Sequence, residues 1–125
     1  SLLDFYRYKS IDNLILKRGI DNLYVVEDYD GVNKKIVSVY SEFTKMGANI
    51  QSNQPAVQFY TGNMMNKSYD GKLSRKYGIH HGMCFEPQLF PILRSSQSNK
   101  CPILYKDDIY SSTIIIKLAN NFEKD

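Results

Sequence analysis

The stretch KKIVSVYSEF, residues 34–43, carries a clear strand pattern. It is rich in β-branched and aromatic residues, which are typical of strands. Successive side chains of a strand point to opposite faces, so Val37, Val39 and Phe43 share one mostly apolar face, and the other face is more polar. The pattern predicts a strand that packs on one side and meets water on the other.

Other short segments on either side of this stretch have the same character. Further strands are predicted at residues 23–28, 47–52, 55–62 and 112–118, the last of them buried. Asp30-Gly31, a dipeptide typical of hairpin turns, separates the first strand from residues 34–43, so we expect an antiparallel meander. Residues 63–82 and 94–100 are predicted loops. No segment carries a helical apolar stripe, which indicates an all-β class.

The length and composition of the chain limit the classes of protein to which it can belong. A chain of 125 residues is one domain or part of one. Its 16 basic and 13 acidic residues give a net charge of +3 without a basic run, so nucleic-acid binding is not expected. No run reaches the roughly 18 apolar residues of a membrane span, and no signal peptide is visible, which predicts a cytoplasmic protein without a membrane partner. The first residue is Ser1, and we expect an upstream part to be missing.

The segment HHGMCFEPQLFP, residues 80–91, holds most of the candidate chemical groups. Read as a strand, it directs Met83 and Phe85 to one face and Cys84 and Glu86 to the other. Because Pro87 cannot donate a ladder hydrogen bond, the strand is expected to end or to lie at a sheet edge there. Glu86 is then either a carboxylate presented to a site or an ordinary surface residue.

The histidines and cysteines of the chain are weaker candidates. His80 and His81 are adjacent, so on a strand they point apart, and no metal site is predicted. Cys84 and His81 are three residues apart and also face opposite ways, which disfavours a catalytic pair. Cys84 and Cys101 have no CxxC spacing and are expected as reduced thiols.

Two further polar residues lie beside predicted strands. In PAVQFYTG, residues 55–62, Val57 and Phe59 share one face and Gln58 and Tyr60 the other. A glutamine beside an aromatic ring suits carbohydrate binding, although both residues also suit a solvent-facing surface. Asp21 precedes an apolar strand and either braces a turn or presents its carboxylate to a ligand.

Taken together, three segments resemble the C-terminal part of the aldose 1-epimerase (galactose mutarotase) family: GIDNLYVV at 19–26, PAVQFYTGNMM at 55–65 and GMCFEPQLFP at 82–91. They occur in the order of the family, and the first and last segments of the chain are also similar to it. The resemblance implies an antiparallel β-sandwich of the galactose mutarotase-like (supersandwich) type. Residues 1–125 would form only its C-terminal portion.

The resemblance also implies a function and a set of site residues. Members interconvert the α and β anomers of free hexoses such as galactose and glucose, without metal or cofactor. Glu86 matches the general base, and Asp21 and Gln58 match residues that bind the sugar. A base removes the anomeric hydroxyl proton while an acid protonates the ring oxygen, and the ring opens and recloses.

The sequence departs from the family in one essential part. The family's acid is a histidine in the preceding half of the sandwich, and His80 and His81 do not occupy its motif. We therefore expect either an incomplete mutarotase or a non-catalytic, degenerate sugar-binding fragment. Half a sandwich leaves strand edges and an apolar face uncovered, which predicts self-association or pairing with a missing N-terminal half. An epimerase of phosphorylated hexoses would need more cations than Arg75 and Lys76.

Overall fold

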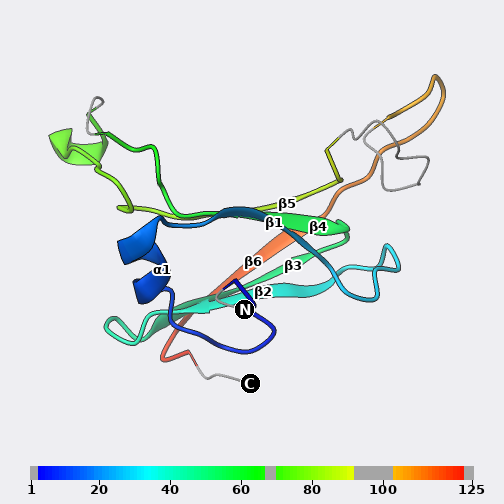
Figure 1. Cartoon of the computed structure of the whole chain (residues 1–125). Helices are drawn as coiled ribbons and strands as arrows, with labels where there is room; N and C mark the ends of the chain where they lie inside the picture. Colours follow the sequence, from blue (N-terminus) through cyan, green and yellow to red (C-terminus); the bar gives the residue numbers. More distant parts are fainter. Residues whose placement is uncertain (1–2, 67–69, 92–102, 123–125) are drawn as a thin grey trace. The chain divides into compact units, whose positions relative to one another are not determined.

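The computed structural model of the chain describes residues 3–66, 70–91 and 103–122 (Figure 1). The predicted loop at 94–100 and Cys101 lie outside the described residues. In chain order the elements are α1 (Asp12–Lys17), β1 (Asp21–Val25), β2 (Lys34–Tyr40), β3 (Met46–Ser52), β4 (Ala56–Tyr60), the 3-10 helix η1 (Lys72–Ser74), β5 (Cys84–Gln88) and β6 (Ile114–Asn120). In the described part the strands form two three-stranded antiparallel sheets, with orders β1-β4-β5 and β2-β3-β6. The predicted β class is confirmed.

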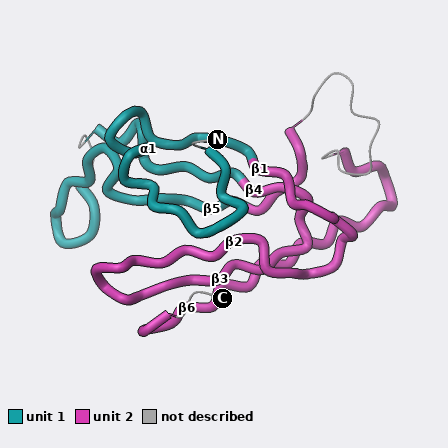
Figure 2. Tube along the Cα trace, turned by 60° about the horizontal axis from the view of Figure 1, so that its bottom comes forward, with its two compact units in different colours: residues 1–23, 58–86 teal, residues 24–57, 87–125 magenta. Residues whose placement is uncertain are grey.

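The chain divides into two compact units, coloured separately in Figure 2. Unit 1 comprises residues 1–23 and 58–86, and unit 2 comprises residues 24–57 and 87–125. The buried residues of unit 1 include Leu14, Ile20, Phe59 and Thr61. Those of unit 2 include Ile50, Pro55, Ala56 and Val57.

In unit 2, β2 and β3 form the predicted hairpin. Their register runs from Lys34 opposite Ser52 to Tyr40 opposite Gly47, with an irregularity between Lys35 and Val37 that leaves Ile36 as an extra residue. The placement of Phe43 on the packed face is wrong, because β2 ends at Tyr40 and the Phe43 side chain is 97% exposed in the turn that follows. The Thr44 amide donates to Ser41 Oγ, which closes this turn locally.

The predicted meander is confirmed only in its second pairing: β2 pairs with β3, but β1 pairs with β4 and not with β2. Val26 N–H donates to the carbonyl of Pro55 just beyond both strands, at 2.9 Å. Asp30-Gly31 does mark a turn, in which Asp30 accepts a hydrogen bond from the backbone of Val32. That bond holds the pKa of the Asp30 carboxyl below its usual value. A turn dipeptide specifies a local bend, whereas the pairing partner of a strand is chosen by distant residues.

Strand β6 pairs with β3, from Ser52 opposite Ile114 to Met46 opposite Asn120. The strand is where the sequence predicts it, but all seven of its residues are exposed, so the expectation that it is buried is wrong. It lies at a sheet edge, where only one neighbour covers it. Just after β6, Phe122 donates its N–H to Lys45 O at 3.1 Å and packs its ring beside Tyr40.

Unit 1 contains the short helix α1, which the sequence reading missed. Six residues are too few for a helical apolar stripe, and only Leu14 is buried. The available signals were Asp12 in the first turn, Lys17 in the last turn, and a glycine just beyond. Gly19 has a φ of +70°, a left-handed conformation that favours glycine and stops a helix. No helix in the described ranges is long and apolar enough to cross a bilayer.

Candidate functional site

The three candidate residues Asp21, Gln58 and Glu86 all belong to unit 1 and to one sheet. Asp21 is the first residue of β1, Gln58 is the middle residue of β4, and Glu86 is the middle residue of β5. Because β4 lies between β1 and β5, each of the three neighbouring strands contributes one polar side chain. The sheet order thus assembles residues that are far apart in the sequence.

Ring packing shows which face of the sheet each residue occupies. Phe59 is 7% exposed, and its ring stacks on that of Phe85 with centroids 4.6 Å apart and planes 16° apart. Phe5 meets Phe59 edge-on at 5.9 Å. Since neighbouring residues of a strand point to opposite faces, Gln58 and Glu86 lie together on the face away from these rings. The predicted parity of β4 and β5 is confirmed.

Asp21 and Gln58 are joined by a direct hydrogen bond. Gln58 Nε2 donates to Asp21 Oδ1 at 2.6 Å, between residues 37 apart in the chain. A carboxylate only accepts hydrogen bonds, so this contact orients the Gln58 amide with its nitrogen toward Asp21. The amide oxygen and the second amide hydrogen are then held in a defined direction. Such a pair can both donate to and accept from a sugar hydroxyl.

Glu86 is exposed on β5, the edge strand of its sheet. The predicted edge position is confirmed, and Pro87 is accommodated without a ladder hydrogen bond because an edge strand leaves one side unpaired. The strand does not end at Pro87 but continues to Gln88. Among the described residues no cation forms a salt bridge with Glu86, so its carboxylate is accessible to a ligand.

The two histidines lie outside any strand, because β5 begins only at Cys84. The strand parity argued for His80, His81 and Met83 therefore does not apply. His80 has a φ of +61°, which breaks the extended chain. Its Nδ1 lies 2.7 Å from the carbonyl oxygen of Thr61, whereas the His81 side chain is exposed. The sequence reading assigned neither of these histidines a structural partner.

A match to the family model for aldose 1-epimerase extends over residues 2–117. The chain belongs to the aldose 1-epimerase family. Galactose mutarotase from Rattus norvegicus is 30% identical over 90 residues, which are 71% of this chain and 23% of the rat protein. The mouse galactose mutarotase is 29% identical over 90 residues, and that of Bos taurus is 43% identical over 42 residues, 34% of this chain and 12% of the bovine protein.

This aldose 1-epimerase family chain therefore spans less than a quarter of the length of the rodent relatives it matches. The matched range contains Asp21, Gln58 and Glu86. It also contains Thr61, which is hydrogen-bonded to Ile20 just before β1, and His80, whose Nδ1 contacts the Thr61 carbonyl.

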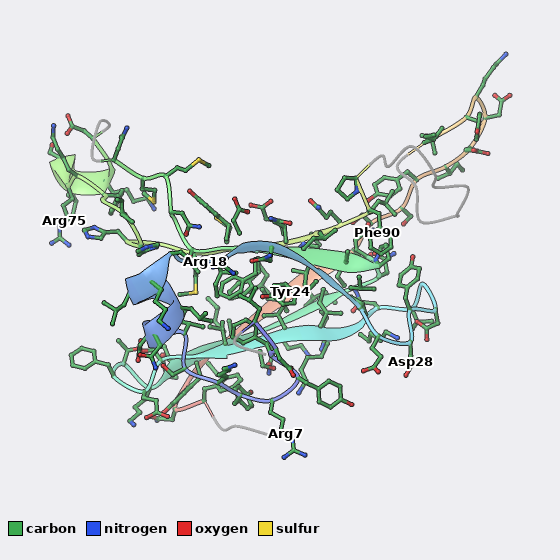
Figure 3. All side chains as sticks on the ribbon, in the orientation of Figure 1. Arg7, Arg18, Tyr24, Asp28, Arg75 and Phe90 are labelled. Atoms are coloured by element: carbon green, nitrogen blue, oxygen red, sulfur yellow. The ribbon has the colours of Figure 1, made fainter. Side chains whose placement is uncertain are left out.

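Metal-ligating side chains and cations are the other chemical groups of this aldose 1-epimerase family chain. Among the described residues, no three His, Cys, Asp or Glu side chains are grouped as metal ligands. Arg18 and Arg75 of unit 1 lie in separate places (Figure 3), and Lys76 lies 3.9 Å from the carboxylate of Asp70. Cys84 is a free, exposed thiol two residues before Glu86.

Proposed function

We propose that this chain supplies the base-bearing part of an aldose 1-epimerase site. Glu86 removes the proton of the anomeric hydroxyl of a free hexose such as galactose or glucose. Asp21 and Gln58 hold hydroxyl groups of the sugar. The observation that carries the proposal is the 2.6 Å hydrogen bond between Asp21 on the edge strand β1 and Gln58 on the central strand β4. The other edge strand of this sheet, β5, presents Glu86.

The chemistry explains why these residue types are suited to the reaction. When the anomeric O–H loses its proton to Glu86, the oxygen forms a carbonyl and the bond from the anomeric carbon to the ring oxygen breaks. An acid must protonate the departing ring oxygen at the same time. The open aldehyde rotates, and the reverse transfers close the ring on its other face. One protein base and one acid on opposite sides of the sugar suffice.

We propose that the acid comes from the part of an aldose 1-epimerase that this chain does not match. The rat relative is matched over only 23% of its length, which leaves ample sequence for that residue. His80 is not proposed as the acid, because it does not occupy the motif of the family's acid histidine. By itself, the chain is then a sugar-binding unit that lacks half of the catalytic pair.

The first test compares the chain alone with a chimera. We expect the chain alone not to accelerate the mutarotation of α-D-galactose above the buffer rate, measured by polarimetry. A chimera in which it replaces the matching segment of rat galactose mutarotase is expected to accelerate it. Catalysis by the chain alone would contradict the proposed origin of the acid. A correctly folded but inactive chimera would contradict the proposed function.

The second test concerns sugar binding by Asp21. Asp21→Asn is expected to weaken galactose binding about tenfold or more, since a hydrogen bond to a charged group contributes about 1.5–3 kcal/mol. Affinity is measured by NMR titration of the chain. Asp70→Asn is the matched control, because Asp70 is also an exposed carboxylate of unit 1 but faces Lys76. Equal affinities of the two variants would show that Asp21 does not contact the sugar.

A further inference from the structure

A part-buried cluster of polar side chains contacts the backbone of Ile20, the residue before Asp21. Thr61, only 1% exposed, accepts the Ile20 N–H through Oγ1 at 2.7 Å, and its own N–H donates to the Ile20 carbonyl at 3.0 Å. Asn63 Nδ2 donates to the same carbonyl at 3.2 Å, and its Oδ1 accepts from the Thr61 hydroxyl at 2.8 Å. The backbone N–H and C=O of Ile20 are therefore both hydrogen-bonded to residues that follow β4.

His80 completes this cluster from the segment that leads into β5. Its Nδ1 lies 2.7 Å from the Thr61 carbonyl, and its backbone N–H donates to the Gly62 carbonyl at 3.1 Å. A carbonyl oxygen only accepts, so the hydrogen of the ring must be on Nδ1. Both the imidazolium and the Nδ1–H tautomer of the neutral ring meet this condition, whereas the Nε2–H tautomer does not.

The cluster is packed tightly against the backbone of Gly19. A Cβ at Gly19 would lie 2.5 Å from His80 Cε1 and 2.1 Å from Asn63 Oδ1, both shorter than any normal contact. The φ of +70° at Gly19 is a second reason for glycine at this position. The His80 ring and the Asn63 amide thus pack against Gly19, two residues before β1 begins.

This arrangement determines where Asp21 lies. The Ile20 carbonyl and the Asp21 N–H belong to one rigid peptide unit, so the bonds to that carbonyl orient the start of β1. They also pin the register of β1 against β4 at this end. A slip of one residue would turn Asp21 to the other face of the sheet, away from Gln58. The position of Asp21 therefore depends on Thr61 and on the residues that hold Thr61 in place.

We propose that His80 is a positioning residue of the sugar site. Through its Nδ1–H bond to the Thr61 carbonyl, it fixes the end of β4 and the start of β1, and so keeps Asp21 within hydrogen-bonding distance of Gln58. The role of the Asp21–Gln58 pair in holding a sugar rests on the proposed function above. The positioning itself is a property of the chain without any ligand.

The test uses variants that differ in where they place a hydrogen-bond donor. In His80→Asn the side-chain NH₂ occupies the place of Nδ1–H, in His80→Gln it lies one bond further out, and His80→Leu has no donor. The readout is the Gln58 side-chain NH₂ pair in ¹H–¹⁵N spectra of the chain without sugar, assigned by its disappearance in Gln58→Glu. We expect His80→Asn to keep the wild-type signals, and His80→Gln and His80→Leu to lose the separate shift of the bonded hydrogen.

A second readout is the tautomer of the His80 ring, from long-range ¹H–¹⁵N spectra of the neutral form. We expect the hydrogen on Nδ1. A ring with its hydrogen on Nε2 would overturn the proposal, as would loss of the Gln58 signature in a folded His80→Asn variant. Unchanged Gln58 signals in folded His80→Gln or His80→Leu would also overturn it. If those two variants do not fold, the His80→Asn variant and the tautomer of the wild-type ring still test the proposal.

Galactose titration of the same samples separates this proposal from the proposed function. We expect His80→Asn to bind galactose within about twofold of wild type, and the two other variants about tenfold more weakly, equivalent to one lost hydrogen bond of about 1.4 kcal/mol. Absence of galactose binding by the wild-type chain would count against the proposed function alone. The signals measured without sugar would still support or overturn the positioning role of His80.

Discussion

Glu86→Gln is expected to lower the rate of galactose mutarotation by about 100- to 10,000-fold, the usual contribution of a positioned general base. The measurement is polarimetry on the chimera with the rat relative. Glutamine has nearly the shape of glutamate, but its amide does not accept a proton at neutral pH. Because Glu86 is exposed and has no salt bridge within the described residues, the substitution should leave the fold unchanged. The loss should therefore appear in kcat more than in KM.

Cys84→Ser is the control for Glu86→Gln. Cys84 lies two residues earlier on β5, is exposed and free, and points to the same face of the strand. Its replacement is expected to change the rate by less than about twofold, since surface substitutions usually cost within about 0.5 kcal/mol. A Glu86→Gln chimera that retained the full rate would show that another group is the base.

Phe59→Ala is expected to lower the free energy of unfolding by about 3–5 kcal/mol, the usual cost of truncating a buried phenylalanine. Phe59 is 7% exposed, stacks on Phe85 and is met edge-on by Phe5. Its loss removes apolar burial and leaves a cavity beside both remaining rings. Because domains are stable by only about 5–15 kcal/mol, this loss is a large share of the total stability. Denaturant titration followed by circular dichroism measures the change.

Phe43→Ala is the matched control, because it makes the same change at a side chain that is 97% exposed. Its effect is expected to stay within about 0.5 kcal/mol. Similar losses from both variants would mean that the Phe59–Phe85 stack does not form the core of unit 1. That result would also remove the argument that these rings direct Gln58 and Glu86 to the opposite face.

Strand parity was within reach of the sequence. The alternation in PAVQFYTG and in MCFEP assigns Val57, Phe59 and Phe85 to the packed face of their strands. It assigns Gln58 and Glu86 to the opposite face. The stacking of the Phe59 and Phe85 rings on one face of the sheet agrees with this assignment. Parity depends only on the period of two of an extended chain, a local property. Where the chain was not extended the same reasoning failed, as at His80, whose φ is +61°, and at Phe43, which lies past the end of β2.

Strand pairing was beyond that reasoning. The Asp30-Gly31 turn suggested that residues 23–28 pair with residues 34–43, but β1 pairs with β4. Just beyond the ends of these two strands, hydrogen bonds join Ile20 and Thr61, which are 41 residues apart. A hydrogen bond between residues so far apart in the sequence produces no periodic pattern in either segment. The same is true of α1, whose six residues are ended by Gly19 without forming an apolar stripe.

The sequence by itself therefore determined the β class, the faces of Gln58 and Glu86, and the resemblance that singled out Asp21, Gln58 and Glu86. These features follow from residue type and short-range spacing. Only the tertiary structure decided that β4 lies between β1 and β5, that Gln58 donates to Asp21, and that His80 and Thr61 support the strand carrying Asp21. Those contacts join residues 19 to 41 positions apart, and only the folded backbone brings their polar groups within hydrogen-bonding distance.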